Sequence, residues 1–330
     1  MSGVQLLTVD QGEDGSRLDR WFKRRFPHVG QGLIQKLCRK GDIRVDGRRA
    51  KTDLRVEMGM EIRVPPLPEP GEVEKIDVLT PEEIHYVRGL VIYEDDELIA
   101  FNKPSGLAVQ GGSKTTKHLD RLLDAFGEGM TRPRLVHRLD KDTSGVLVVG
   151  RTPKATARLA KAFQQHRTKK TYWAIAIGVP KPRMGEIKGF LKKAAGAGGD
   201  PDRELMVGAS HGDPGSHHAL TRYTVIADAG QKASWVALRP VTGRTHQLRV
   251  HLAAMGTAIL GDRKYTCDRP APEDLGQRLC LHARRLEIPR DNGNPLVIEA
   301  DLPKPLAKVF DTLGFNPREI DEAEIEDQLA

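Results

Sequence analysis

Apolar residues recur at helical spacing in two stretches near the start of the chain. One covers residues 18–26, and the other covers residues 33–38 and is followed by Gly41, in the position where helices commonly stop. The run DIRVDGRRA alternates apolar and polar residues around Asp46 and Gly47, which predicts a tight hairpin, and MEIRVPP predicts a closing strand. We therefore expect two short helices and a few short strands in this part.

The longer part of the chain, from residue 90 to about residue 313, mixes both kinds of pattern. Short apolar runs typical of strands alternate with two clear helical stretches, and no internal repeat is evident. One helix is expected to begin at Thr152 and Pro153, a good N-cap and first-turn pair, and the other to run from about Thr245 to Met255. The predicted fold class is α+β with a mixed or antiparallel sheet.

The second of these helices has two unlike faces. Leu248 and Leu252 lie on one side and predict the surface that packs on the core, whereas His246 and Arg249 lie on the other side. We expect Arg249 to project away from the core toward a cleft. Spacing alone does not make it functional, because a lone arginine on a polar helix face is usually just solvated.

Changes in composition divide the chain further. Residues 65–89 hold five prolines among several acids, which predicts a semi-rigid linker. From Arg318 onward six acids accompany one cation, which predicts a solvated acidic tail at residues 314–330. The expected division is a first domain at 1–64, the linker, a second domain at 90–313 and the tail.

The composition of the 330 residues, 38% of them hydrophobic, is that of a soluble globular protein. The chain has no run of eighteen apolar residues, and its first residues lack the regions of a secretory signal. We therefore expect a cytoplasmic protein without a membrane span. Cys38, Cys267 and Cys280 are widely spaced and predict neither a disulfide framework nor a zinc finger.

Positive charge is concentrated in the first domain. Between Arg17 and Arg55 there are thirteen lysines and arginines against four acids, an excess of nine cations. A basic module on an otherwise balanced chain is the electrostatic signature of a protein that binds a polyanion. A solvated charged face explains such a cluster equally well, so charge alone does not decide.

The segment RLVHRLDKDTSGVLVVGRT, residues 134–152, indicates chemistry. Two short apolar runs are joined by a polar loop whose members are His137, Arg138, Asp140, Lys141, Asp142, Thr143, Ser144 and Gly145. Connectors usually need only Gly, Pro, Asn, Asp or Ser, so a loop with two carboxylates, several cations and two hydroxyls predicts a site that binds or converts a ligand. Spacing alone does not rank the two aspartates.

Three simpler site types are disfavoured. GLAVQGGSKT is glycine-rich, but Gly112 and Ser113 stand where a P-loop needs Gly-Lys, and Ser144 lacks the setting of a nucleophilic serine. His211 lies in a Gly- and Pro-rich insertion at 196–216, and His217 and His218 follow it directly. That insertion is expected to be a mobile surface loop and not a metal site.

The order RLDRWF, LIQKLCRKGDIRVDGRRA and GMEIRV in the first domain resembles the S4 RNA-binding domain. In that domain two helices present basic side chains to structured RNA, so the resemblance implies that the polyanion is RNA. The residues then expected to contact RNA are Arg17, Arg20, Arg24, Lys36, Arg39, Lys40 and Arg48.

Four ordered segments of the longer part resemble the motifs of the RluA-type pseudouridine synthases. They are FNKPSGLAVQGG at 101–112, LVHRLDKDTSGVLVVGRT at 135–152, KKTYWAIAIG at 169–178 and GRTHQLRVHLAAMGTAILGD at 243–262. With an S4-like domain in front, the chain is similar to the branch that acts on the ribosomal large subunit, and the wording of the first two motifs favours type C over type D. Gln110 departs from the pattern, because many members have His there.

The resemblance implies an enzyme that isomerises specific uridines of 23S ribosomal RNA to pseudouridine. The reaction breaks the bond between ribose C1′ and base N1 and rejoins the base through C5, without net redox change or hydrolysis. It implies no metal, no organic cofactor and no nucleotide cofactor. The expected partner is 23S ribosomal RNA in the large subunit or its precursor, and the protein is expected to be a monomer.

The family match also implies roles for particular residues. Asp140 is expected to act on the nucleotide as a nucleophile at C1′ or a base at C2′, and Arg249 to pair with it. Tyr172 is expected to lie against the target base, although without the motif an ordinary sheet residue would explain it better. Arg138 is expected to fill the vacated space or hold the flipped nucleotide. His137 is expected to shape the loop and to contribute to RNA binding, or equally to be a buried, hydrogen-bonded histidine.

Other functions stay open from the sequence. A noncatalytic RNA-binding factor for ribosome assembly would need only the S4-like domain, and the set of Asp140, Tyr172 and Arg249 speaks against it. An RNA-cleaving or base-removing enzyme would use similar carboxylate chemistry but would leave strand breaks or abasic sites. A type D-like synthase would differ in its ribosomal target.

Overall fold

The computed structural model describes residues 3–68, 78–111, 117–127, 131–194, 205–273, 275–290 and 293–330. The chain forms two compact units, Met1–Val78 and Leu79–Ala330. Each unit has its own sheet and its own hydrophobic core. Among the residues described, no helix is long and apolar enough to cross a membrane.

The first unit is a small antiparallel sheet packed against two helices. The strand order is β1-β4-β2-β3. Trp21, Phe22 and Ile34 of the helices are fully buried together with Ile62 of the sheet. The elements in chain order are β1 (Gln5–Thr8), the 3-10 helix η1 (Gln11–Glu13), α1 (Leu18–Arg25), α2 (Gln31–Lys40), β2 (Arg44–Val45), β3 (Arg48–Arg49) and β4 (Glu61–Val64).

The helices, the hairpin and the closing strand expected in this unit are confirmed. Helix α2 is followed by Gly41 in the left-handed conformation, with φ of 79°. Asp46 and Gly47 both have positive φ, 47° and 73°, as a two-residue hairpin turn requires. Strand β1 was not expected, because its sequence QLLT places two leucines side by side instead of alternating them with polar residues.

The boundary between the units lies within the expected linker, after Val78. Residues 69–77 are outside the described part of the chain. The linker prediction is wrong for its last residues, because α3 (Pro81–Arg88) belongs to the second unit. Thr80 caps this helix by accepting a hydrogen bond from the backbone of Glu83 (3.2 Å), and the Glu83 carboxylate bonds back to the Thr80 backbone.

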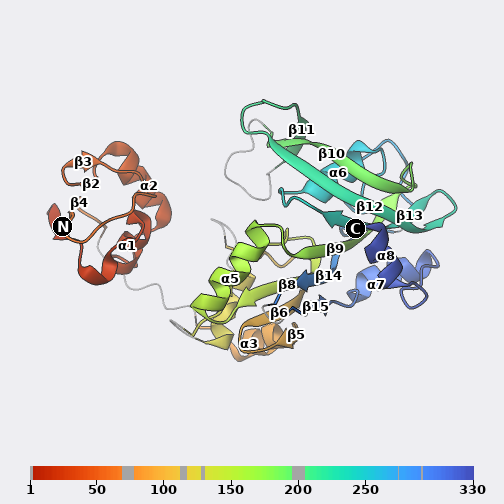
Figure 1. Ribbon diagram of the computed structural model, residues 1–330, viewed down its shortest axis with the longest axis horizontal. Helices are drawn as coiled ribbons and strands as arrows, with labels where there is room; N and C mark the ends of the chain where they lie inside the picture. Colours follow the sequence, from red (N-terminus) through yellow and green to blue (C-terminus); the bar gives the residue numbers. More distant parts are fainter. Residues whose placement is uncertain are drawn as a thin grey trace. The chain divides into compact units, whose positions relative to one another are not determined.

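The second unit is built on an eleven-stranded sheet (Figure 1). The order is β11-β10-β12-β13-β9-β14-β8-β6-β5, with β15 beside β14 and β7 beside β8. The pair β14 and β8 is parallel and the other pairs are antiparallel, so the predicted α+β class with a mixed sheet is confirmed. The strands are β5 (Val91–Glu94), β6 (Leu98–Lys103), β7 (Arg134–Leu135), β8 (Ser144–Gly150), β9 (Lys169–Ile177), β10 (Met184–Lys193), β11 (Met206–Ala209), β12 (His217–Ala229), β13 (Ala233–Pro240), β14 (Leu281–Ile288) and β15 (Leu296–Glu299).

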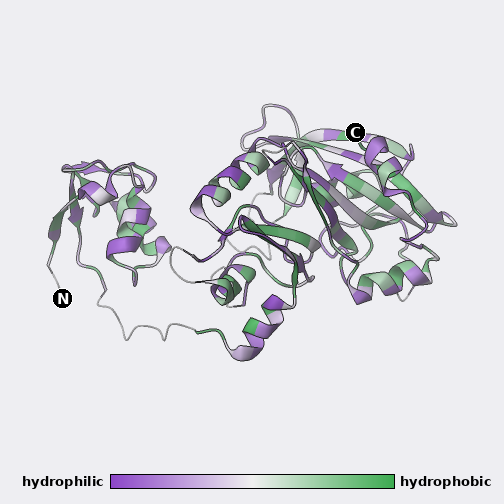
Figure 2. Ribbon diagram, turned by 60° about the horizontal axis from the view of Figure 1, so that its bottom comes forward, coloured by the Kyte–Doolittle hydropathy of each residue, from purple (hydrophilic) through white to green (hydrophobic). Residues whose placement is uncertain are grey.

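Helices cover both sides of this sheet. Helix α5 packs against β8, α6 against β11, β12 and β13, and α8 against β12. Hydrophobic residues are concentrated in the central strands, while the helices carry both kinds of residue (Figure 2). The helices that follow α3 are α4 (Leu119–Leu122), the 3-10 helix η2 (Leu123–Phe126), α5 (Pro153–Gln164), α6 (Gln247–Ala254), α7 (Lys304–Thr312) and α8 (Glu322–Gln328).

Strand β9 has two faces with different neighbours. Trp173 lies 4.8 Å from Trp235 of β13 and 6.3 Å from Phe310 of α7, measured between ring centroids. Thr171, on the same face, donates a hydrogen bond to Glu326 of α8. Because side chains alternate along a strand, Lys170 and Tyr172 leave the opposite face of the sheet. One face of β9 is therefore core, and the other is available for a site.

The expectation of a mobile loop at 196–216 is wrong for the part of it that the structure describes. Residues 195–204 lie outside that part. Beyond them, β11 pairs with β10, and its first residue Met206 is buried. The backbone N–H of Met206 donates to the hydroxyl of Tyr265 (2.9 Å), which fixes the strand to the rest of the unit.

The expectation of a solvated acidic tail at 314–330 is also wrong. Helix α8 forms there, and Ile325 and Leu329 are buried in the main core of the second unit. Apolar residues four positions apart lie on one side of a helix, so this short element has a hydrophobic side despite its net charge.

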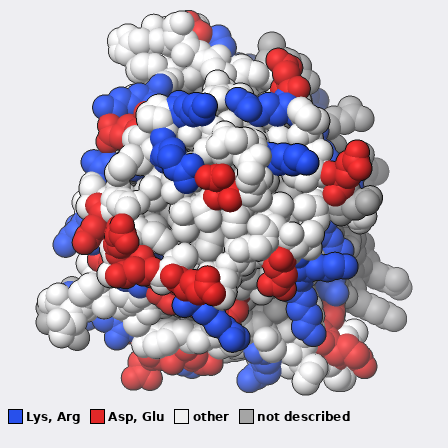
Figure 3. All heavy atoms as spheres, turned by 90° about the vertical axis from the view of Figure 1, so that its right-hand side faces the viewer, with Lys and Arg blue, Asp and Glu red and all other residues white. Residues whose placement is uncertain are grey.

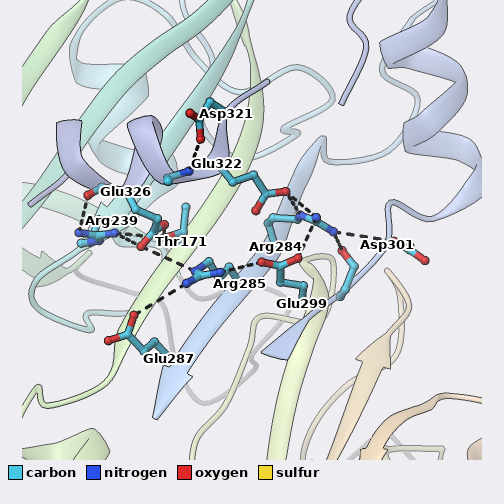
Figure 4. A network of polar contacts seen from close by, with 12 residues as sticks. Thr171, Arg239, Arg284, Arg285, Glu287, Glu299, Asp301, Asp321, Glu322 and Glu326 are labelled. Carbon is cyan, nitrogen blue, oxygen red and sulfur yellow. Dashed lines mark hydrogen bonds and ion pairs between the residues drawn. The ribbon is translucent and has the colours of Figure 1, made fainter. Parts of the chain in front are cut away.

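The acids of α8 are paired with arginines of the sheet (Figure 4). Glu322 accepts a hydrogen bond of 2.6 Å from Arg284 of β14. Glu326 pairs with Arg239 of β13 and lies 3.8 Å from Arg285 of β14. The net charge of the segment therefore compensates cations that are distant in sequence. On the right-hand side of Figure 1, where α7 and α8 lie, both signs of charge are interspersed (Figure 3).

Replacing Leu329 with alanine tests whether the tail is part of the core. We expect Leu329→Ala to lower the free energy of unfolding by about 2 to 5 kcal/mol, because it leaves a cavity at a fully buried position. Urea denaturation followed by tryptophan fluorescence measures the change. Asp327→Ala, at an exposed position of the same helix, is the control and should change stability little. Equal stability of Leu329→Ala and the wild type would contradict the packing of α8.

Candidate active site

Asp140 lies in the loop between β7 and β8, and this loop is held in place by Lys103 at the end of β6. Lys103 is completely buried, and its ammonium donates hydrogen bonds to three backbone carbonyls, those of Pro104 (3.0 Å), Leu107 (2.9 Å) and Lys141 (3.0 Å). Burial lowers the pKa of Lys103 to about 7, and the charges of Asp140 and Asp142 oppose this shift. The NKPSG segment is thus a structural turn that supports the Asp140 loop.

The other end of the loop is fixed to β14. The hydroxyl of Ser144 lies 2.8 Å from His282 Nδ1, and His282 Nε2 lies 3.0 Å from the carbonyl of Ala300. Burial lowers the pKa of His282 to about 4, so the neutral ring donates to Ala300 and accepts from Ser144. Gly145 has φ of 111°, and a Cβ there would lie 2.2 Å from the Ala283 carbonyl oxygen. The TSG sequence therefore allows close strand pairing directly after Asp140.

Arg249 reaches Asp140 from α6. Its Nη1 lies 3.9 Å from Asp140 Oδ2, while two hydrogen bonds of 2.7 Å join it to Asp262. As predicted, Arg249 points toward a cleft, since it lines both cavities that meet at Asp140. It is not solvated, however, because only 4% of its side chain is exposed. The residues of α6 pack on strands β11, β12 and β13 of the sheet and, through Val250, on Tyr265. The sequence did not single out Asp262.

Asp262 is itself held rigidly. Its Oδ1 accepts the backbone N–H groups of Lys264 (2.8 Å) and Tyr265 (3.1 Å), and the ring of Tyr265 lies 5.1 Å from the Arg249 guanidinium. Burial opposes the charge of Arg249, but the hydrogen bonds with Asp262 and the charges of Asp262 and Asp140 leave its pKa above the ordinary value. Arg249 is thus a permanent, fixed cation beside Asp140.

His246 faces the same carboxylate. It precedes α6 in the left-handed conformation, with φ of 52°, and its Nε2 lies 4.0 Å from Asp140 Oδ2. Its Nδ1 lies 2.8 Å from the hydroxyl of Tyr265, which already accepts the N–H of Met206. The hydroxyl can therefore donate its proton to Nδ1, in which case the ring N–H is on Nε2, toward Asp140. Sequence reasoning placed His246 beside Arg249 but gave it no role.

Two cavities meet at Asp140. One of about 630 Å³ is lined by Gln110, Lys141 and Arg263, and the other, of about 480 Å³, by Tyr172, Lys170 and Arg244. Both are also lined by Arg138, Leu139, Asp140, Thr245, His246 and Arg249. The three predicted catalytic residues, Asp140, Tyr172 and Arg249, are therefore brought together around one hollow.

Tyr172 lines the second cavity from the face of β9 opposite to Trp173. Burial raises the pKa of the Tyr172 phenol, and the negative charge of Asp140 raises it further. The side chain is consequently a neutral phenol. It offers an aromatic face and a hydroxyl to a ligand, and not a phenolate.

Arg138 and His137 have different surroundings. Arg138 is exposed and lines both cavities. His137 Nε2 accepts the backbone N–H of Val148 (2.9 Å), and its ring stacks on Phe163 at 4.2 Å between centroids. Burial lowers the pKa of His137 to about 3, so the ring is neutral. Of the two alternatives for His137, the hydrogen-bonded structural histidine fits this geometry.

The basic residues predicted to bind RNA lie on the first unit. Arg17 is held by two hydrogen bonds to Asp19, of 3.1 and 2.8 Å, so its charge is locally compensated. The others are exposed, namely Arg20, Arg24, Lys36, Arg39, Lys40 and Arg48. Among the residues described in either unit, no group of three or more His, Cys, Asp and Glu could hold a metal ion.

Comparison with known proteins gives the class to which this fold and site correspond. Residues 97–254 match the family described as RNA pseudouridylate synthase. A solved structure, human RNA pseudouridylate synthase domain containing 4, aligns with a TM-score of 0.58 and 26% identity over 71% of this chain and 97% of that one.

Whole-length relatives extend the match over both units. The ribosomal large subunit pseudouridine synthase C of Rickettsia bellii is 34% identical over 298 residues, which are 87% of this chain and 95% of that protein. The protein of the same name from Vibrio vulnificus is 31% identical over 316 residues, 94% of this chain and 96% of its own. The chain belongs to the RNA pseudouridylate synthase family.

Replacing Asp262 with asparagine tests how Arg249 is positioned. Asp262→Asn removes the charge that anchors Arg249, so the guanidinium should shift, and we expect pseudouridine formation to slow by about 100-fold, the usual cost of a displacement near 1 Å. Breaking the buried pair should also lower stability, by about 3 to 5 kcal/mol. Single-turnover rates measured well below the unfolding temperature separate the two effects. Asp268→Asn, an exposed carboxylate of the same loop, is the control, and full activity of Asp262→Asn would rule out the anchor.

Proposed function

We propose that this protein converts uridines of large-subunit ribosomal RNA to pseudouridine at the cavity where Asp140, Arg249 and Tyr172 meet. The observation that carries the proposal is the position of Asp140, with a fixed guanidinium 3.9 Å away and a tyrosine in the wall of the same hollow. Family membership supplies the reaction, and the geometry supports the roles of the side chains.

Asp140 is the group that acts on the nucleotide. As a nucleophile at C1′ it would form an ester and release the uracil as an anion, and as a base at C2′ it would take a proton and release the same anion. In either course the base rotates and C5 bonds to C1′, which regenerates the carboxylate, either as the leaving group of the ester or by return of the proton to C2′. C5 then loses its proton and N1, now free of the ribose, takes one up, so that the product is an isomer of the substrate. Arg249 compensates the negative charge of Asp140, and His246 Nε2 faces the same carboxylate oxygen at 4.0 Å.

Tyr172 and Arg138 position the base. A neutral phenol can stack on the uracil and hydrogen-bond to it during rotation, which is consistent with the raised pKa of Tyr172. A uridine in folded RNA reaches this cavity only when it is extruded, at a cost of a few kcal/mol. Arg138, exposed at the junction of both cavities, is placed to fill the vacated stack or to hold the flipped nucleotide.

The proposed substrate is 23S ribosomal RNA, the type C target class. Relatives that cover most of this chain carry the name ribosomal large subunit pseudouridine synthase C. We further propose that the first unit is an S4-type RNA-binding module, because two short helices, a tight hairpin and exposed cations on α1 and α2 match that pattern. A cytoplasmic monomer that needs no cofactor completes the proposal.

Complementation in cells tests the function and the role of Asp140 together. Cells that lack this protein should lose specific carbodiimide-dependent primer-extension stops on 23S RNA, and wild-type protein should restore them. Asp140→Asn should restore none, because an amide is neither a nucleophile nor a base of useful strength. Asp142→Asn, an exposed carboxylate of the same loop, is the matched control and should restore them. Stops restored by Asp140→Asn would refute its role, and stops unaffected by the deletion would refute the substrate.

The salt dependence of RNA binding tests the role of the first unit. Changing Lys36, Arg39 and Lys40 together to glutamine removes three exposed cations from α2. If they contact phosphates, the slope of log K against log salt should become shallower by about 2 to 3, since each contact contributes about 0.7 to 0.9. The control is the same change at three exposed cations of the second unit, Lys304, Lys308 and Arg318. Equal slopes for the wild type and the α2 variant would remove this unit from the binding surface.

A further inference from the structure

Lys170 is a partly buried cation in the wall of the cavity that Tyr172 and Asp140 share. It stands two positions before Tyr172 on β9, so both side chains leave the same face of the sheet, about 6.6 Å apart along the strand. Throughout the part of the chain that the structure describes, no carboxylate or other acceptor lies within bonding distance of the Lys170 ammonium. This lysine faces the substrate space without a partner from the protein.

Two other lysines show how unusual this is within the same site. Lys103 is buried more deeply, but three carbonyls accept its hydrogen bonds. Lys169, the neighbour of Lys170 on β9, faces the opposite side of the sheet, where its ammonium lies 3.0 Å from Glu287. Each of these lysines is satisfied by the protein, and Lys170 is not.

The residues closest to Lys170 in the cavity wall carry no negative charge that offsets its burial. The residues that line the cavity near it include His166 and Arg244, and the pKa of His166 is lowered by burial and then by the positive charges of Lys170 and Arg244. Burial lowers the pKa of Lys170 itself, and the described residues supply no acid that offsets this. A cation taken out of water without a counter-charge is costly, so this end of the cavity is suited to an anionic ligand.

We propose that Lys170 binds a backbone phosphate next to the flipped uridine, so that the base rests on Tyr172 while the ribose faces Asp140. This inference rests on the proposed action on RNA. The contact between Lys170 and the phosphate would fix how far the flipped nucleotide enters the cavity. The carboxylate of Asp140 repels a phosphate, and the Lys170 ammonium, two positions from Tyr172 on β9, attracts it. Lys170 and Tyr172 together therefore determine the orientation of the phosphate, ribose and base in the cavity.

Substitution at Lys170 with its neighbour as control tests the contact. Lys170→Met keeps the length of the side chain and removes the charge, so we expect KM for a short stem-loop from 23S RNA to rise by about 10-fold or more with kcat nearly unchanged, the effect of losing one charge-assisted hydrogen bond. Lys170→Arg should restore most of the loss. Lys169→Met, which removes a cation from the opposite face of β9, should leave both constants unchanged.

A chemical change in the RNA makes the test specific for phosphate. Replacing one phosphate on either side of the target uridine with an uncharged methylphosphonate should weaken wild-type binding at one of the two positions. At that position the methylphosphonate should not weaken binding by Lys170→Met any further, because both changes remove the same contact.

The outcomes separate this inference from the proposed function. If the wild type is active, and Lys170→Met and the methylphosphonate together weaken binding no more than either change alone, the phosphate contact is supported. An active wild type whose KM is unaffected by Lys170→Met, a loss confined to kcat, or additive losses at both phosphates would overturn it. An inactive wild type would refute the proposed function instead. Should Lys170→Met not fold, Lys170→Gln and the methylphosphonate RNAs with wild-type protein give the same comparison.

Discussion

Arg249 places one guanidinium between two carboxylates, and the rest of the site depends on this arrangement. Asp262 takes two hydrogen bonds of 2.7 Å and has no exposed side-chain surface, so it fixes the orientation of the guanidinium. Asp140 lies 3.9 Å away and keeps 23% of its side chain exposed. The close pair of Arg249 and Asp262 is structural, whereas the longer contact with Arg249 leaves the oxygens of Asp140 accessible. Since arginine does not lose its proton, the field at Asp140 is permanent.

The site exists only when distant segments are brought together by the sheet. Helix α6 supplies Arg249, the residue before it is His246, the segment after it supplies Asp262, and the loop before β8 supplies Asp140. Lys103 and His282 anchor that loop from two other strands. Across β9, the opposite face is packed by α7 and α8, and the acids of α8 compensate the arginines of β13 and β14. Burial of one face makes the other rigid enough to hold a site.

The sequence predicted the elements with strong local signals, such as α2 with its terminal Gly41 and the Asp46-Gly47 hairpin. The motif pattern also predicted that Asp140, Tyr172 and Arg249 lie close together, because the resemblance implies that these motif positions form one active site. It did not predict Asp262, whose role depends on which buried cation it faces.

Net charge was misleading at the C-terminus for a related reason. The partners of Glu322 and Glu326 are 38 and 87 residues away in the chain, so no local pattern reveals that these acids are paired. The sequence also does not reveal that Lys170 lacks a counter-charge, because its neighbour Lys169 is the same residue type and is paired with Glu287. Local patterns predict secondary structure, whereas the pairing of buried charges depends on tertiary contacts.

The most direct measurement of the central claim is the release of tritium from 23S RNA labelled at C5 of uridine, with purified protein and no added cofactor. If Asp140, fixed beside Arg249, drives isomerisation, wild-type protein should release tritium in proportion to pseudouridine formed, with the RNA unchanged in length. Asp140→Asn should release none. Release by Asp140→Asn at the wild-type rate, or release accompanied by strand breaks or abasic sites, would contradict the account.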